Sequence, residues 1–177
     1  MVTKAGRLSP YFFNAGLIYD GASLRQLADF YAEAIVQSKI KFDILFGPAY
    51  KGITLAAATA MMLSERSLNK NFAYSRKEIK DHGEGGNLVG APLTGQVLII
   101  DDVISSSRSI RESISLIQKS GASPCGVVLS LDRMEKGNGE LSATAEISQE
   151  YGIPVFAIAN VHAVSYTHLR AHETRHD

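Results

Sequence analysis

Strand-like apolar runs alternate along this chain with windows in which apolar residues recur at helical spacing, and this alternation limits the folds open to it. Gly, Pro, Asn and Asp stand at the joins between the windows. The strand-like windows are 42–46, 72–75, 97–100, 126–131 and 153–158, and the helix-like windows are 23–38, 53–63, 109–121 and 142–150. Because strands that are apolar throughout are buried on both faces, the sequence predicts an α/β fold with a mostly parallel central sheet and helices on both faces.

Two of the helical windows have well-defined faces. The buried face of the first is expected to hold Leu24, Leu27, Tyr31 and Ile35, and that of the third Ile110, Ile114 and Ile117. The third window opens with Ser109 and has Glu112 three residues later, a capping-box pattern, and Gly121 stands at its end. We therefore expect a helix that begins at Ser109 and ends near Gly121.

Two segments lack this periodicity. Residues 77–92 are polar and include Gly83, Gly85, Gly86 and Gly90, which predicts a long mobile loop, and loops of that length are usually functional. The segment 165–177 holds three of the five histidines and has no apolar periodicity. We expect residues 1–164 to form one domain and 165–177 to be a non-native, disordered tail. Its evenly spaced histidines are also compatible with a metal-binding helix face.

Composition narrows the class of protein. A chain of 177 residues with 45% apolar residues suffices for one domain with a single core. Eighteen Lys plus Arg balance eighteen Asp plus Glu, so no overall charge attracts nucleic acid or an acidic membrane surface. The only cysteine, Cys125, lies in an apolar run, as expected in a reducing compartment. With neither a signal peptide nor a membrane-spanning run in the sequence, we expect a cytoplasmic protein.

The segment VLIIDDVISSSRS, residues 97–109, combines an apolar strand, two acids and a hydroxyl-rich turn that leads into a helix. Ligands of parallel sheets bind at the carboxyl ends of the strands, where Asp101 and Asp102 stand. The N–H groups of the helix start can hold a phosphate. The paired carboxylates suit ribose hydroxyls, or a Mg²⁺ ion shared with the ligand. The pattern indicates a ribose 5-phosphate site; the alternative is a serine-rich turn that the acids merely cap.

This segment resembles the 5-phosphoribosyl 1-diphosphate (PRPP) motif of the type I phosphoribosyltransferases. Four more segments resemble bacterial orotate phosphoribosyltransferases in order and spacing: SPYFFNAGL (9–17), FDILFGPAYKGI (42–53), RKEIKDHGEGGNLVG (76–90) and SLDR (130–133). The resemblance covers residues 4–158. It implies a Rossmann-like fold with a small N-terminal hood, and a homodimer. It also implies Mg²⁺-dependent synthesis of orotidine 5-phosphate and pyrophosphate from orotate and PRPP, in pyrimidine synthesis.

The resemblance also implies roles for individual residues. Those expected to bind PRPP are Tyr50, Lys51, Arg76, Lys77, Lys80, His82, Asp101, Asp102, Val103, Ile104, Ser105, Ser106, Ser107, Arg108 and Ser109. Those expected to bind orotate are Lys4, Phe12, Phe13, Ser105 and Arg133. Lys80, His82, Asp101 and Asp102 are expected to be catalytic, and Arg76, Lys80 and His82 to reach the active site of the neighbouring subunit. No side chain is expected to bind metal directly, since PRPP would hold the Mg²⁺ near the acid pair.

The implied chemistry explains these residue types. Loss of pyrophosphate from the anomeric carbon leaves a ribosyl cation while negative charge builds on the diphosphate, so fixed cations and Mg²⁺ are needed around it. A glycine-rich loop that closes over the substrates keeps water from the cation. Related enzymes also hold a strained peptide at the position of 49–51 in this chain.

The phosphate turn departs from the family, which commonly has Thr-Ala-Gly-Thr where this chain has residues 105–108. If position 107 needs a positive φ, Ser107 adds strain of about 1 kcal/mol or more. Arg108 would either compensate by its charge or obstruct the site. We expect weakened PRPP binding. Family members also normally begin further upstream with a helix, so Met1 is expected to be an internal start.

Other interpretations remain at this stage. Taken singly, Phe12 and Phe13 fit a core or hairpin, Arg76 to Lys80 a solvated charge run, and Arg133 a surface ion pair. A purine phosphoribosyltransferase is one alternative, although PYFFN and KDHGEGGNLVG fit the orotate branch better. A PRPP-binding regulator without catalysis is another, although such proteins usually lack the catalytic loop that holds Lys80 and His82.

Overall fold

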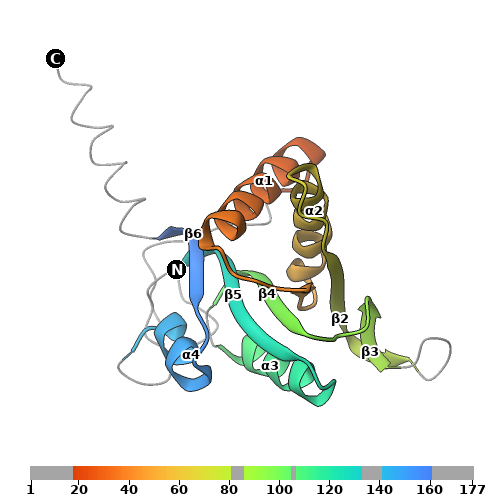
Figure 1. Ribbon diagram of the computed structural model, residues 1–177, viewed down its shortest axis with the longest axis vertical. Helices are drawn as coiled ribbons and strands as arrows, with labels where there is room; N and C mark the ends of the chain where they lie inside the picture. The colour runs from red at the N-terminus through yellow and green to blue at the C-terminus, as the bar shows by residue number, and fades with distance from the viewer. Residues whose placement is uncertain (1–17, 81–85, 105–106, 133–140, 161–177) are drawn as a thin grey trace.

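The computed structural model describes residues 18–80, 86–104, 107–132 and 141–160 (Figure 1). Within these residues one sheet holds β1 (Ile44–Gly47), β2 (Asn71–Lys80), β3 (Gly86–Gly90), β4 (Gln96–Val103), β5 (Ser123–Asp132) and β6 (Val155–Asn160). The strand order is β3-β2-β1-β4-β5-β6. All neighbouring strands are parallel except β2 and β3, which are antiparallel. The predicted mostly parallel sheet is confirmed.

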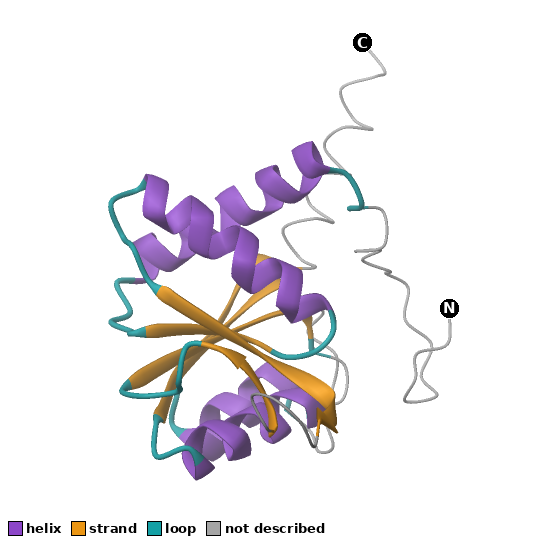
Figure 2. Cartoon of the chain, turned by 90° about the vertical axis from the view of Figure 1, so that its right-hand side faces the viewer, coloured by secondary structure: helices purple, strands orange, loops and turns teal. Residues whose placement is uncertain are grey.

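The helices form a layer on each face of this sheet (Figure 2). They are α1 (Gly21–Ser38), α2 (Lys51–Glu65), α3 (Arg108–Lys119) and α4 (Ala143–Tyr151). Side chains of α1 and α2 share one buried cluster with Leu98 and Ile100, and those of α3 and α4 share another with Val97 and Ile99. Successive residues of β4 thus enter opposite cores, which is why this strand is apolar without interruption.

The start of α3 differs from the predicted capping box. The helix begins at Arg108, and the residue before it, Ser107, is its N-cap. Ser109 is therefore already helical, and Glu112 accepts a hydrogen bond from Nε of Arg108 at 2.8 Å. Several serines in this segment could serve as the N-cap, and the sequence pattern alone does not distinguish between them.

The loop predicted for residues 77–92 is largely a strand hairpin. β2 continues to Lys80 and pairs with β3, with Ser75 opposite Leu88 and Lys80 opposite Gly86. The prediction is wrong for 77–80 and 86–90, while 81–85 lie outside the described residues. The hairpin lies at the edge of the sheet. Strands there are held by backbone hydrogen bonds and need not be apolar, so they lack the pattern by which a buried strand is predicted.

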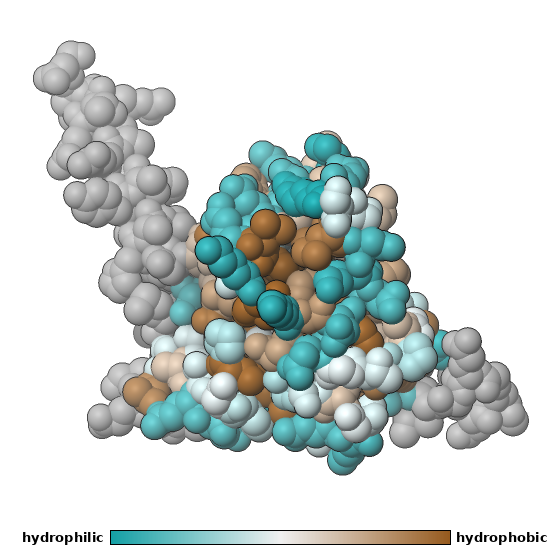
Figure 3. All heavy atoms as spheres, viewed as in Figure 1, coloured by the Kyte–Doolittle hydropathy of each residue, from teal (hydrophilic) through white to brown (hydrophobic). Residues whose placement is uncertain are grey.

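The surface seen in Figure 3 is mainly hydrophilic, with apolar side chains gathered over α1. Phe30 and Val36 of α1 are both 46% exposed. None of the described helices has the length and apolar character needed to cross a membrane. The expected N-terminal hood and non-native tail concern 1–17 and 165–177, which lie outside the described residues.

Candidate active site

The acid pair predicted from the sequence lies at the carboxyl end of β4. Asp102 is buried and Asp101 is partly buried. The N–H of Asp102 donates to Oδ1 of Asp101 at 2.9 Å, and the N–H of Val103 donates to Oδ1 of Asp102 at 2.8 Å. Each carboxylate is thus held by the backbone that follows it, in the position where ligands of parallel sheets bind.

The environment of Asp101 disfavours its charged form. Burial and, after it, the neighbouring charge of Asp102 raise the pKa of Asp101 from 3.8 to about 7. The charge of Lys51 acts in the opposite direction but is the weaker influence. A second cation or a set of hydroxyl donors at this site would therefore be favourable.

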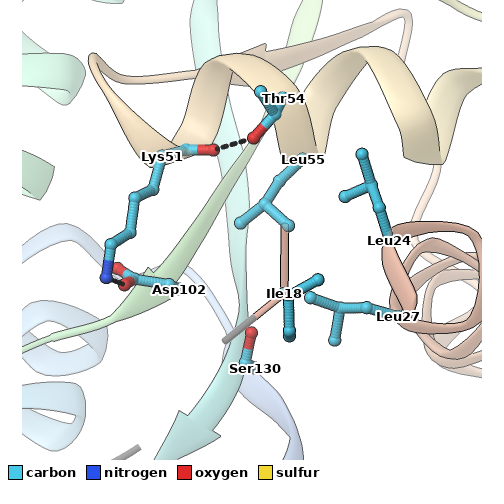
Figure 4. A pocket seen from close by; sticks show the side chains of 8 residues that line it. All are labelled: Ile18, Leu24, Leu27, Lys51, Thr54, Leu55, Asp102 and Ser130. Carbon is cyan, nitrogen blue, oxygen red and sulfur yellow. Dashed lines mark hydrogen bonds and ion pairs between the residues drawn. The ribbon is translucent and has the colours of Figure 1, made fainter. Parts of the chain in front are cut away.

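Lys51 comes from the first turn of α2 and reaches across to the acid pair (Figure 4). Its Nζ atom lies 2.7 Å from Oδ2 of Asp102. The Lys51 side chain is 56% exposed whereas that of Asp102 is 12% exposed, so the ammonium group remains open to an anionic ligand. The pair joins the β1–α2 turn to the end of β4.

Close backbone packing shapes the β1–α2 turn. A Cβ atom on Gly47 would lie 1.9 Å from the carbonyl oxygen of Gly52, so the end of β1 can lie against the start of α2 only without a side chain. The N–H of Ala49 donates to Oγ of Ser75 on β2 at 3.0 Å. The peptide bond between Ala49 and Tyr50 is cis.

Several predicted cationic residues lie beside this turn. Nζ of Lys77 lies 4.9 Å from the centroid of the Tyr50 ring, a cation–π contact. A cleft of about 870 Å³ extends from the turn across β2 and β3 to the start of α3. Arg76, Lys77, Arg108 and Ser109 all line it, so four predicted PRPP-binding residues share one cleft.

Position 107 has the positive φ on which the expected strain at Ser107 depends. Ser107 has φ 55° and is 3% exposed. Its hydroxyl makes no capping hydrogen bond and lies 3.5 Å from the carbonyl oxygen of Ala143. A serine therefore occupies the left-handed conformation that glycine adopts without cost. Arg108 pairs with Glu112 on the exposed side of α3, and Ile104 is buried in the core beneath the turn.

A smaller cleft of about 50 Å³ is lined in part by the Lys51–Asp102 pair (Figure 4). One wall is apolar and consists of Ile18, Leu24, Leu27 and Leu55. The other wall is polar and includes Ser130 from the end of β5. This arrangement suits a ligand with one apolar and one hydroxyl-bearing side.

Several predicted site residues lie outside the described residues: Lys4, Phe12, Phe13, His82, Ser105, Ser106 and Arg133. Lys80 ends β2, and only its backbone is described. The sequence reasoning did not identify Tyr31 as part of the site. The sequence feature that could have indicated it is a tyrosine on a helix face expected to be buried, because a buried tyrosine hydroxyl needs a hydrogen-bond partner. Among the described residues no three His, Cys, Asp or Glu side chains form a metal-binding group.

A model of the phosphoribosyl transferase domain matches residues 15–152. The chain is 69% identical over 159 residues to the orotate phosphoribosyltransferase of Neisseria meningitidis serogroup C, an alignment that covers 90% of this chain and 75% of that protein. This chain belongs to the orotate phosphoribosyltransferase family. The orotate phosphoribosyltransferase of Laribacter hongkongensis is 65% identical over 160 residues, again covering 90% of this chain and 75% of the relative.

Two solved structures, one of them an orotate phosphoribosyltransferase, share this fold. The crystal structure of the Francisella tularensis enzyme has a TM-score of 0.83 at 46% identity, covering 93% of this chain and 79% of that one. Leishmania donovani UMP synthase has a TM-score of 0.71 at 26% identity over 92% of this chain and 33% of that one. The predicted Rossmann-like phosphoribosyltransferase fold is thus confirmed.

Proposed function

We propose that this protein transfers the 5-phosphoribosyl group of PRPP to orotate, which gives orotidine 5-phosphate and pyrophosphate for pyrimidine synthesis. The bond from the anomeric carbon to the diphosphate oxygen breaks, and a bond from that carbon to a ring nitrogen of orotate forms as the nitrogen loses its proton. The observation that carries the proposal is the convergence of Asp101, Asp102, Lys51 and the start of α3 on one edge of the sheet.

The acid pair is suited to the ribose. Hydroxyl groups of the sugar would donate to Asp101 and Asp102, whose carboxylates are already oriented by backbone N–H groups. These bonds would fix the anomeric carbon relative to the leaving group. Negative charge beside the sugar would also favour the ribosyl cation in the transition state.

The cationic cleft is suited to the diphosphate. Lys51 and Lys77 carry exposed ammonium groups near Tyr50. Cations placed where negative charge develops stabilise the transition state more than the ground state. The carboxylate oxygens of Asp101 and Asp102 are the ligand type that Mg²⁺ prefers, but two side chains do not make a cage, so PRPP would supply most of its ligands. Mg²⁺ would neutralise part of the diphosphate charge.

The turn at 105–109 is proposed to hold the 5-phosphate. Ser107 leaves the start of α3 without a side-chain cap, so its first N–H groups are available to an anion. We further propose that Lys4, Phe12, Phe13, Ser105 and Arg133 bind orotate. A flat anionic ring would stack on the aromatic rings while the cations meet its carboxylate.

We also propose a homodimer in which Arg76, Lys80 and His82 act on the partner's substrates. The test mixes two inactive variants, Lys80→Ala and Lys51→Ala, after reversible subunit exchange. If the loop acts across the interface, each heterodimer has one intact site, and about a quarter of the wild-type activity returns. No recovery despite proven exchange would place Lys80 in the site of its own subunit.

The proposed location is the cytoplasm, where Cys125 would stay reduced. Burial raises the pKa of the Cys125 thiol to about 11, so it is largely protonated and unreactive near neutral pH. Fractionation of cells that express the full chain tests the location.

The function is tested by the loss of orotate absorbance after PRPP and Mg²⁺ are added to purified protein. We expect turnover that disappears with Lys80→Ala and with chelation of Mg²⁺, and that hypoxanthine does not inhibit. Folded, dimeric protein that binds PRPP without turnover would instead support a PRPP-binding regulator. Competition by hypoxanthine would indicate a purine phosphoribosyltransferase.

A further inference from the structure

The hydroxyl group of Tyr31 joins three elements beneath the candidate active site. Tyr31 lies in the middle of α1 and is completely buried. Its Oη atom donates to the carbonyl oxygen of Asp101 on β4 at 2.7 Å and lies 2.5 Å from Oγ of Ser130 on β5. Since β4 and β5 are neighbouring strands, one hydroxyl group connects α1 to both.

The direction of these bonds follows from the number of protons. A tyrosine hydroxyl has one proton, and the Asp101 carbonyl can only accept, so that proton is used there. The Ser130 hydroxyl must then donate to Oη of Tyr31. Burial raises the pKa of Tyr31, which keeps its hydroxyl protonated and able to donate.

The carbonyl that Tyr31 holds belongs to the peptide that separates the two acids. The same peptide carries the N–H of Asp102, which donates to Oδ1 of the Asp101 carboxylate. In a planar trans peptide the C=O and N–H point in opposite directions, so fixing the oxygen also fixes the N–H. Asp102 in turn holds Lys51 at 2.7 Å. The orientation of the acid pair and of Lys51 therefore depends on this peptide.

We infer that Tyr31, together with Ser130, is a positioning residue for the acid pair in PRPP binding and turnover. It does not contact the substrate; it orients the Asp101–Asp102 peptide. This inference rests on the proposed function, because it assigns the acid pair to the ribose. Loss of the hydroxyl would leave the ring packing unchanged but release the Asp101 carbonyl, so the effect is expected on PRPP and not on orotate.

The first experiment compares Tyr31→Phe with Tyr151→Phe in the full-length protein. Tyr151→Phe also removes a hydroxyl group, but Tyr151 ends α4 and packs against the core on the opposite face of the sheet. We expect Tyr31→Phe to lower kcat/KM for PRPP by roughly 10- to 100-fold, as a small misplacement of reacting groups does. KM for orotate should change less than about twofold. Tyr151→Phe should match the wild type in both.

A second pair of variants keeps the test informative if Tyr31→Phe does not fold. Ser130→Ala removes the donor to Tyr31, and Ser130→Thr restores a hydroxyl at the same position. We expect Ser130→Ala to weaken PRPP selectively and Ser130→Thr to recover most of the loss. The double variant Tyr31→Phe with Ser130→Ala should cost little more than the greater single loss, because both act through one hydroxyl.

Binding of PRPP alone separates this inference from the proposed function. If the wild type binds PRPP but does not consume orotate, the proposed reaction fails while the dissociation constants of the variants still test Tyr31. Tyr31→Phe or Ser130→Ala with wild-type PRPP affinity would overturn the inference. Equal losses for PRPP and orotate, or a lower melting temperature with unchanged kinetics, would also overturn it, since a purely structural role has that result.

Discussion

Nζ of Lys51 at the start of α2 lies 2.7 Å from Oδ2 of Asp102 at the end of β4, although 51 residues separate them in the chain. The contact places a cation from the β1–α2 turn beside the acids of the phosphate-turn motif. Because the Lys51 ammonium group is held by the Asp102 carboxylate before any ligand binds, it is already oriented toward the place where the diphosphate of PRPP would lie beside the ribose.

Replacing Lys51 by alanine should affect activity far more than stability. The Lys51 ammonium is largely exposed, so loss of the pair should lower the free energy of unfolding by only about 1 kcal/mol or less. We expect kcat/KM for PRPP to fall by about 100-fold or more, because a group that stabilises developing charge is lost. Lys70→Ala is the matched control: Lys70 bonds to the carbonyl oxygen of Phe42 at the opposite end of the strands. Equal activity of the two variants would contradict the role of Lys51.

Asp101→Asn should stabilise the free protein while it impairs the enzyme. Because the folded-state pKa of Asp101 lies above 3.8, its carboxyl group favours the folded state at acid pH, and that contribution is lost as the pH rises through about 7. Asparagine does not ionise, so at pH 8 the variant should gain about 1 kcal/mol or more, a rise in Tm of roughly 2 to 4 °C. At pH 4 the gain should disappear. Thermal unfolding at both pH values checks this, and a lower Tm at pH 8 would contradict it.

The double variant Ser107→Gly with Arg108→Thr should bind PRPP more tightly than the wild type. Glycine removes the strain of the left-handed backbone at position 107, which favours the folded protein by about 1 kcal/mol. The greater conformational entropy of glycine in the unfolded chain offsets part of this gain. Threonine removes a guanidinium that lines the cleft. Calorimetric titration with PRPP measures the change, and an unchanged dissociation constant would rule out this explanation.

Ser67→Gly is the matched control for that variant. Ser67 also has a positive φ, 59°, but lies in the exposed turn after α2. The substitution should change thermal stability by a similar amount and leave PRPP affinity as in the wild type. An equal gain in PRPP affinity from Ser67→Gly would mean that general stability, and not the phosphate turn, causes the effect.

Gly47→Ala should disrupt the β1–α2 turn. The added Cβ would lie 1.9 Å from the carbonyl oxygen of Gly52, and that oxygen belongs to the backbone of α2, which cannot move aside freely. We expect a loss of stability of about 3 kcal/mol or more and little activity. Gly21→Ala is the control, because nothing lies within 4 Å of a Cβ built there at the start of α1. Denaturant unfolding should show Gly21→Ala at or above wild-type stability.

The sequence alone determined the features that depend on local pattern. The apolar runs predicted the parallel strands, and the helical spacing predicted two residues of the buried face of α1, Tyr31 and Ile35, while Leu24 and Leu27 are only partly buried. The Asp101–Asp102 pair could be assigned to a strand end because it follows such a run directly. Because the family commonly has glycine where this chain has Ser107, the sequence raised the question of a positive φ there, and the structure has φ 55°.

Tertiary structure decided which of these groups meet. Two of these contacts, the Lys51–Asp102 pair and the bond from Tyr31 to the Asp101 carbonyl, join residues far apart in the chain. The extension of β2 to Lys80 depends on backbone hydrogen bonds, which every residue type except proline can make. Tyr31 is 70 residues from Asp101 and 99 from Ser130, and no local periodicity records such a contact. Hydrogen bonds between distant groups are fixed only when the packed core brings their elements together, because burial then makes an unpaired polar group costly.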